Sequence, residues 1–289
     1  MQLTIQNLSK TYPNGVQALQ DVNLDIPTGM YGLLGPNGAG KSTLMRTLAT
    51  LQDADSGSIM LGDIDVLRDK DAVRQVLGYL PQEFGVYPRI SALDLLEHFA
   101  VLKGIPSKER KSVVEALLQR TNLWDHRKKA VSSYSGGMRQ RFGIAQALLG
   151  DPKLIIVDEP TAGLDPGERN RFHNLLSEIG ENVIVILSTH IVDDVKELCP
   201  NMAIINMGKV LYAGTPEDAL NDIAGKVWKK TVAKSEIEAY QSRFGNAIIS
   251  SKLVAGKPIL HIFSKENPED GFAAVAPDLE DVFFSKIVG

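Results

Sequence analysis

One nine-residue segment restricts the possible folds of this chain more than any other: residues 35–43 read Gly-Pro-Asn-Gly-Ala-Gly-Lys-Ser-Thr. They match in full the pattern G-x-x-x-x-G-K-[ST], in which backbone N–H groups of a glycine-rich loop cradle phosphates. An apolar run at residues 30–34 precedes the loop, and leucines at helical spacing follow it. The loop therefore lies between a predicted buried strand and a predicted helix, whose N-terminus adds a favourable dipole for an anion. The alternative, a glycine-rich turn that binds nothing, requires a chance match with a probability on the order of 1%.

Two side chains of this loop have expected chemical roles. Lys41 is expected to reach the β- and γ-phosphates of a nucleotide, and Ser42 to supply a hydroxyl group to Mg²⁺. The full set of loop residues expected to bind the nucleotide is Gly35, Pro36, Asn37, Gly38, Ala39, Gly40, Lys41, Ser42 and Thr43.

A second motif pairs two adjacent carboxylates with a buried strand. Residues 154–159 read Leu-Ile-Ile-Val-Asp-Glu. In open α/β sheets ligands bind beyond the carboxyl ends of the strands, so both acids are expected to face the nucleotide. Asp158 fits the residue that holds Mg²⁺, and Glu159 fits the general base for the attacking water. Taken alone, the same residues are equally well explained as a polar strand end before a turn at Pro160.

The rest of the chain divides into three regions with different hydrophobic patterns. Up to about residue 215, short apolar runs alternate with amphipathic stretches, which predicts a layered α/β domain. Strands are expected at residues 4–8, 19–26, 30–34, 154–157 and 183–187. The last two are continuous apolar runs, as expected of strands covered on both faces.

Residues from about 85 to 150 are predicted to form a helical subdomain inserted into this domain. Ser91 and Asp94 resemble a capping box before a first helix, and residues 108–119 are expected to form a second. A third contains Met138 and Leu149 and is closed by Gly150. After residue 220, a hairpin of strands at 247–251 and 258–263 and a helix at 277–288 predict a small α+β appendage over residues 221–289.

Composition excludes several classes of function. The net charge of −4 and a pI near 5.8 give no basic surface for nucleic acid, so no nucleic-acid partner is expected. A single cysteine, Cys199, excludes an internal disulfide and a multi-cysteine metal site. Neither a signal peptide nor an apolar run near the ~20 residues of a membrane span is visible, so any membrane role is expected to come through a partner.

The motif Ser135-Gly136-Gly137 narrows the class of nucleotide-binding protein. It opens the third helix of the insert and gives a second cluster of N–H groups suited to an anion, although taken alone it is better explained as an ordinary helix cap. In this order with the two motifs above, the chain resembles the ATP-binding-cassette (ABC) ATPase family over roughly residues 1–220. The family's signature motif is Leu-Ser-Gly-Gly-Gln, whereas residues 134–138 here read Tyr-Ser-Gly-Gly-Met, so its core is intact and both flanks differ.

The resemblance assigns roles to four further residues. It implies that Tyr12 stacks on the adenine of ATP, Gln82 contacts Mg²⁺ and water, and His190, after the strand at 183–187, contacts the γ-phosphate. It implies that Asp165, in Gly163-Leu164-Asp165, belongs to the family's D-loop and is one of the ATP-binding residues, together with Ser135, Gly136 and Gly137, although a plain N-cap explains Asp165 as well. The catalytic set is then Glu159, His190 and Lys41, and the metal set Ser42, Gln82 and Asp158. His98, His126, His173 and His261 match no motif and are interpreted as ordinary.

The family also implies a fold and partners. The fold would combine a mostly parallel sheet, an antiparallel β part and the helical insert. Two cassettes would bind ATP and Mg²⁺ head to tail, as a homodimer if both sites are active, each ATP lying between one phosphate loop and the partner's Ser135-Gly136-Gly137 segment. A helix of an integral-membrane permease would dock beside Gln82, at residues 84–90, holding the chain at the cytoplasmic face of the membrane. Residues 84–90 are explained equally well as a buried connection into the helical insert.

The C-terminal segment bears on the direction of transport. Residues 278–284, Asp-Leu-Glu-Asp-Val-Phe-Phe, resemble the ending of cassettes from exporters with a separately encoded permease, and they also fit an amphipathic closing helix. The sequence therefore predicts the ATP-hydrolysing subunit of an ABC exporter. The alternative is a soluble ABC ATPase of translation or DNA repair, which usually carries two cassettes or a coiled-coil insertion. A regulatory protein that holds ATP without cleaving it conflicts with the presence of Glu159 and His190.

Overall fold

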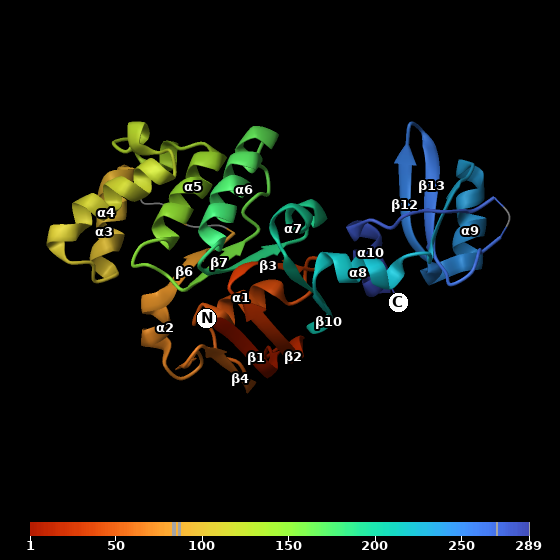
Figure 1. Ribbon diagram of the computed structural model, residues 1–289, viewed down its shortest axis with the longest axis horizontal. Helices are drawn as coiled ribbons and strands as arrows, with labels where there is room; N and C mark the ends of the chain where they lie inside the picture. The colour runs from red at the N-terminus through yellow and green to blue at the C-terminus, as the bar shows by residue number, and fades with distance from the viewer. Residues whose placement is uncertain (83–84, 86–87, 270, 289) are drawn as a thin grey trace.

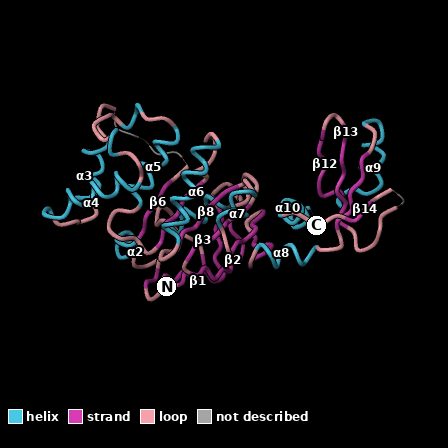
Figure 2. The backbone as a smooth tube through the Cα atoms, turned by 45° about the horizontal axis from the view of Figure 1, so that its top comes forward, coloured by secondary structure: helices cyan, strands magenta, loops and turns pink. Residues whose placement is uncertain are grey.

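The structure is a computed structural model that describes residues 1–82, 85, 88–269 and 271–288. The chain is elongated, with a helical part at one end, a β-rich core in the middle and a smaller α+β part at the other end (Figure 1). The described strands form three sheets, two in the core and one in the smaller part. Figure 2 shows the core strands gathered between the two ends of the molecule.

The central sheet has the strand order β10-β9-β3-β8-β7-β6 among the described residues. All neighbouring strands are parallel except β10, which runs antiparallel to β9 at one edge. The strands are β3 (Gly29–Leu34), β6 (Leu77–Leu80), β7 (Leu154–Asp158), β8 (Ile184–Thr189), β9 (Asn201–Asn206) and β10 (Lys209–Gly214). The predicted strands at 30–34 and 154–157 are confirmed, and that at 183–187 is confirmed except that β8 starts one residue later and continues to Thr189.

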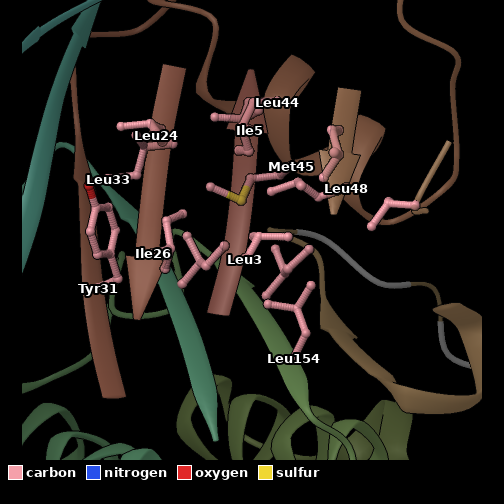
Figure 3. Packing of buried hydrophobic residues seen from close by; sticks show 14 of the residues in the cluster. Leu3, Ile5, Leu24, Ile26, Tyr31, Leu33, Leu44, Met45, Leu48 and Leu154 are labelled. Carbon is pink, nitrogen blue, oxygen red and sulfur yellow. The ribbon is translucent and has the colours of Figure 1, made fainter. Parts of the chain in front are cut away.

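A second, antiparallel sheet lies against the first. It consists of β1 (Gln2–Thr11), β2 (Gln17–Pro27), β4 (Ser56–Leu61) and β5 (Ile64–Asp65), in the order β2-β1-β4-β5. Alternate residues of β2 are buried, as expected of a strand with one face in the core. Helix α1 (Lys41–Leu48) is packed between the sheets, and Figure 3 shows Leu44, Met45 and Leu48 of this helix beside Leu3, Ile5 and Leu154. Helix α2 (Lys70–Val76) leads into β6.

The helices between β6 and β7 share an apolar core of their own. They are α3 (Ala92–Leu102), α4 (Ser107–Arg120) and α5 (Gly136–Ala147), and short 3₁₀ turns at Trp124–His126 and Val131–Ser133 connect the last two. The Ser91 side chain accepts a hydrogen bond from the Asp94 N–H, which confirms the predicted cap. Phe142, Val114 and Leu96 are fully buried in this core. The helices are therefore held by their own packing as well as by the sheet.

The other face of the central sheet is covered by α6 (Pro166–Gly180) and α7 (Val192–Leu198). The smaller part follows α8 (Pro216–Ile223) and has the strand order β12-β13-β11-β14 among the described residues. Its elements are β11 (Val227–Thr231), a 3₁₀ turn (Lys234–Glu236), α9 (Ile237–Phe244), a second 3₁₀ turn (Gly245–Ala247), β12 (Ile248–Val254), β13 (Lys257–Phe263) and β14 (Ala273–Ala274). The predicted hairpin is confirmed, with Val254 paired to Lys257 across its turn.

The last helix, α10 (Leu279–Val288), returns from the smaller part to the core. Leu279, Val282 and Phe283 are buried in one apolar cluster with Val195 and Leu198 of α7. Burial of such side chains stabilises a contact by roughly 1.5–3 kcal/mol each. The smaller part is therefore joined to the core through packed side chains as well as through the chain. Among the residues that the structure describes, no helix has both the length and the apolar character needed to cross a membrane.

Candidate functional site

The phosphate loop lies at the carboxyl edge of the central sheet. Strand β3 ends at Leu34, and α1 begins at Lys41. Close packing explains two of the loop glycines. A Cβ atom at Gly35 would lie 2.4 Å from the Ile205 carbonyl oxygen, and Gly40 combines a φ of +107° with the Ala18 carbonyl oxygen 2.3 Å from an added Cβ. A side chain at either position would push the loop out of place.

Parallel pairing brings the other motifs to the same edge. Strand β8 lies between β3 and β7, with Leu34 opposite Thr189 and Asp158 opposite Ser188. The residues that follow these strands therefore emerge side by side. They surround a pocket of about 450 Å³, lined by residues 36–43 together with Tyr12, Val16, Gln17, Ala18, Gln82 and Glu159. The volume suits a small organic ligand.

Lys41 is the buried cation of this pocket, with 5% of its surface exposed. Its Nζ atom donates hydrogen bonds to the carbonyl oxygens of Gly35 (2.6 Å) and Pro36 (3.2 Å) and lies 3.6 Å from Glu159 Oε1. Burial lowers the pKa of Lys41, and the nearby carboxylates of Glu159 and Asp158 oppose this shift. The ammonium group of Lys41 is therefore poorly solvated, which favours the binding of an anion beside it.

Three predicted site residues converge on the Glu159 carboxylate. Gln82 Nε2 donates to Oε2 at 3.3 Å, and His190 Nδ1 lies 3.2 Å from Oε1, the same oxygen that faces Lys41. The Glu159 N–H donates to the Ser188 carbonyl oxygen at 2.8 Å, and its φ of +47° lies in the left-handed region that non-glycine residues seldom adopt. Strained backbone of this kind often accompanies functional sites. His190 itself directly follows β8, which ends at Thr189.

Asp158, the last residue of β7, is buried beneath Glu159 with 5% of its surface exposed. Burial raises the pKa of its carboxyl group, and the Ser188 and Ser42 hydroxyl groups beside it oppose the shift. Among the described residues its Oδ1 atom has no hydrogen-bond partner. A buried carboxylate oxygen without a partner beside a serine hydroxyl is a donor set that suits Mg²⁺, which prefers hard oxygen ligands.

Tyr12 stands at the entrance of the pocket, directly after β1. Its hydroxyl group lies 3.2 Å from Thr43 Oγ1 and donates to Gln52 Oε1 at 3.1 Å. These contacts fix the ring beside the phosphate loop. The sequence offered no signal for Gln52, because the contact joins residues 40 positions apart.

Ser135 and Gly136 are exposed at the start of α5, away from this pocket's described lining. Ser135 caps the helix by accepting from the Met138 N–H at 3.2 Å, so its capping role is observed. Gly137 is packed tightly, because an added Cβ would lie 2.4 Å from Glu168 Oε2, and Glu168 pairs with Arg141 of the same helix.

The two departures from the family's signature motif have a structural reason. Tyr134 is buried in the insert, where its hydroxyl group donates to the His126 carbonyl oxygen at 2.9 Å and burial raises its pKa. Met138 is half-buried against the same apolar core. Both flanking side chains therefore serve the packing of the insert, while Ser135 and Gly136 remain accessible.

Asp165 is exposed and caps α6, with its Oδ1 atom accepting from the Glu168 N–H at 2.9 Å. The predicted N-cap is therefore observed.

The sequence analysis missed His173, which it interpreted as ordinary. This residue is 5% exposed and lies between the carboxylates of Asp194 and Glu197, 2.9 Å from each. No motif marks Asp194, which lies in α7 four residues after His190.

A groove of about 610 Å³ lies between the core and the insert. Its walls include Leu51, Tyr79 and Pro81 from the core and Phe99 and Leu102 from α3. The sequence predicted a docking groove at residues 84–90; of these, Phe84, Val86 and Tyr87 lie outside the described residues. The groove itself is formed by residues on both sides of that segment.

The fold and the pocket together define a phosphate-loop nucleotide-binding protein. Comparisons with known proteins narrow this class. Residues 19–162 match the model of the ABC transporter family. The chain is 35% identical over 244 residues to the ABC transporter ATP-binding protein NatA of Bacillus subtilis, covering 83% of this chain and 92% of that protein. The chain belongs to the ABC transporter family of ATP-binding proteins, a family of ATPases.

Two further comparisons set the limits of the match. The chain is 32% identical over 305 residues to YbhF of Escherichia coli, a probable multidrug ABC transporter ATP-binding protein, and the matched region covers 99% of this chain. It spans 52%, about half, of that relative's length. The dimeric structure of the bacterial ABC transporter cassette MJ0796 superposes with a TM-score of 0.67 at 26% identity, over 74% of this chain and 98% of that one. The predicted family and fold class are confirmed.

Proposed function

We propose that this chain is the ATP-hydrolysing motor subunit of an ABC exporter. The observation that carries the proposal is the position of Glu159, whose carboxylate lies within 3.6 Å of Lys41, 3.3 Å of Gln82 and 3.2 Å of His190. These are the groups needed to hold a phosphate, orient a water and remove its proton.

In this proposal Glu159 accepts a proton from water, the water oxygen bonds to the γ-phosphorus, and the bond from that phosphorus to the bridging oxygen of ADP breaks. Lys41 exchanges its Gly35 and Pro36 carbonyl partners for phosphate oxygens, while His190 contacts the γ-phosphate from the neighbouring strand end. Tyr12 stacks on the adenine, since its ring is already fixed at the pocket entrance.

Mg²⁺ is the cofactor that fits these residues. Asp158, Ser42 and Gln82 would hold it, and the buried Asp158 Oδ1 atom, which has no hydrogen-bond partner in the described part of the chain, supports that role. When bound, the ion neutralises the charge of the β- and γ-phosphates.

The exposed Ser135-Gly136 segment is proposed to bind the γ-phosphate of a partner's ATP. Its helix N-terminus is suited to an anion, yet it is not part of the described lining of this chain's own pocket. A head-to-tail pair of cassettes, with Asp165 at its interface, would bring it to a second phosphate loop. The dimeric structure of the similar cassette MJ0796 supports such a pairing.

The groove between the core and the insert is proposed to receive a helix of a membrane permease. Leu51 and Leu102 on its walls are 57% and 67% exposed, and exposed apolar side chains facing one groove favour a helical partner. Lys103, which follows α3, joins the insert to the core at this groove by donating to the carbonyl oxygens of Arg74 (2.8 Å) and Leu77 (2.7 Å). Movement of the insert relative to the core would then reach the permease.

Export is favoured by two features: the tail at residues 278–284 and the similarity to YbhF, a probable multidrug ABC transporter ATP-binding protein. We take residues 1–220 as the cassette, with its insert at about 85–150, and residues 221–289 as an accessory region. The chain would lie at the cytoplasmic face of the membrane through its permease.

The coupling is tested by purifying the tagged full chain from solubilised membranes. We expect a multi-span membrane protein to co-purify, and Leu102→Asp to abolish this recovery. Leu253→Asp, at the exposed tip of the β12–β13 hairpin, is the matched control and should retain it. Ribosomes or DNA in place of a membrane protein, or equal recovery with Leu102→Asp, would contradict the proposal.

A further inference from the structure

Asp194 is a buried carboxylate that the proposed reaction does not use. It lies in the first turn of α7, four residues after His190, and none of its surface is exposed. Removing a carboxylate from water is costly unless it is paired and hydrogen-bonded. Its partners therefore show what the fold gains from keeping it there.

Asp194 is paired with two side chains of α6, Arg169 and His173. Arg169 Nε donates to Asp194 Oδ1 at 3.0 Å, and His173 Nε2 lies 2.9 Å from the same oxygen. The other ring nitrogen of His173 lies 2.9 Å from Glu197 Oε2. These pairs join α6 to α7.

The second oxygen of Asp194 contacts the end of β8, directly before His190. Its Oδ2 atom accepts from Thr189 Oγ1 at 3.2 Å, and Thr189 Oγ1 in turn accepts from the Ile191 N–H at 2.9 Å. Thr189 precedes His190, and its hydroxyl group is bonded to the backbone of Ile191, the residue after His190. The hydrogen bond to Asp194 holds this hydroxyl group in one orientation.

The same oxygen also reaches the loop before α6. Asp194 Oδ2 accepts from Thr161 Oγ1 at 2.6 Å, and the Thr161 carbonyl oxygen accepts from the Leu164 N–H at 3.2 Å, directly before Asp165. Thr161 and Thr189 are 4% and 1% exposed. One buried oxygen therefore binds the segment that carries His190 and the turn that carries Asp165.

We propose that Asp194 is a positioning residue that fixes His190 through Thr189 and the turn before Asp165 through Thr161, so that these two parts of the ATP site move together. The inference rests on the proposed role of His190 in ATP hydrolysis. Because none of the hydrogen bonds of this network among the described residues reaches the phosphate loop at residues 35–43, the network should govern turnover and leave ATP binding unchanged. A displacement of about 1 Å at a reacting group can lower a rate by about 100-fold.

The test compares kcat and KM for phosphate release from ATP by the purified full chain. Thr189→Val keeps the shape of the side chain and removes the hydroxyl group that bonds to Asp194 and Ile191. Asp194→Asn keeps the size of the side chain and removes the charge. We expect kcat to fall about 10-fold or more in each variant, with KM for ATP changed less than about 2-fold, as for other groups that act by orienting a reacting side chain. The double variant should lose no more than Asp194→Asn alone, since both substitutions break one network.

Asp193→Asn is the matched control, because Asp193 is the exposed neighbour on the same helix, and it should keep the wild-type kcat. A thermal melt of every variant gives its folded fraction at the assay temperature. The proposal is overturned if folded Thr189→Val and Asp194→Asn keep the wild-type kcat, if the loss equals the unfolded fraction, or if KM rises at unchanged kcat. A wild-type chain that releases no phosphate would overturn the proposed function itself, and this inference with it.

Discussion

The side-chain nitrogen of Lys41 lies 3.6 Å from Glu159 Oε1 and donates to the carbonyl oxygen of Gly35 at 2.6 Å. The cation of the phosphate loop is thus bound to its own loop and to the proposed general base. Phosphate oxygens would replace both contacts. This relationship links ATP binding to catalysis, because moving Lys41 onto phosphate frees the Glu159 oxygen for water.

Lys41→Ala should therefore lose both ATP binding and hydrolysis. Hydrogen bonds to charged groups contribute roughly 1.5–3 kcal/mol each, so we expect ATP affinity to fall at least about 10-fold. Isothermal titration with ATP measures the change. Lys10→Ala is the control, because Lys10 pairs with Asp55 on the surface, 2.8 Å away, and should leave affinity unchanged. Wild-type affinity in Lys41→Ala would count against the phosphate-cradle interpretation.

Asp158→Asn should raise thermal stability at neutral pH while removing turnover. Burial raises the pKa of Asp158 above its ordinary value of 3.8, so the folded state binds its proton more tightly than the unfolded state. Its contribution to stability is therefore fully present below pH 3.8 and is lost as pH rises through the raised pKa. Asn cannot ionise, so the free energy of unfolding of the nucleotide-free Asp158→Asn chain should no longer fall as the pH rises from 3.8 through the raised pKa. Melting curves at several pH values measure the effect. A lower Tm for Asp158→Asn at pH 7 would show that this account of the site is wrong.

The sequence predicts best those elements whose signal is local. The apolar runs at residues 30–34 and 154–157 become β3 and β7, and the cap at Ser91 is observed. Strands β6 and β9 were not predicted, although β9 contains an apolar run. β6 has four residues, too few for a period, and β9 is paired with β3, about 170 residues away in the chain. Such pairing is decided by tertiary contacts.

The same contrast holds for the candidate site. The phosphate loop and the Asp158–Glu159 pair carry their chemistry in consecutive residues, so their positions follow from the motifs. His173 and Asp194 are 21 residues apart and meet only because α6 and α7 pack against the same sheet face. A single histidine between ordinary helical residues gives no sign of this contact. Packing alone creates that network.

Phe283→Ala should destabilise the whole chain, because α10 shares an apolar cluster with α7. Truncating a buried phenylalanine costs about 3–5 kcal/mol, and each kcal/mol lowers Tm by roughly 2–4 °C in a protein near this size. Leu253→Ala, at the 62% exposed hairpin tip, should change stability by less than about 0.5 kcal/mol. Calorimetry distinguishes the outcomes. If Phe283→Ala moved only a separate minor transition, residues 221–289 would be an independently folding unit.

The central claim is that Glu159 is the base of an ATP site completed by a second copy of the chain. Glu159→Gln removes the base and leaves Lys41 and the loop intact, so ATP should bind and stay uncleaved. The most direct measurement is the molar mass of Glu159→Gln in ATP and Mg²⁺ by light scattering, with phosphate release measured on the same sample. We predict a stable dimer, phosphate release lowered at least about 100-fold, and a monomer without nucleotide. Wild-type phosphate release, or a chain that remains monomeric at saturating ATP, would contradict the account.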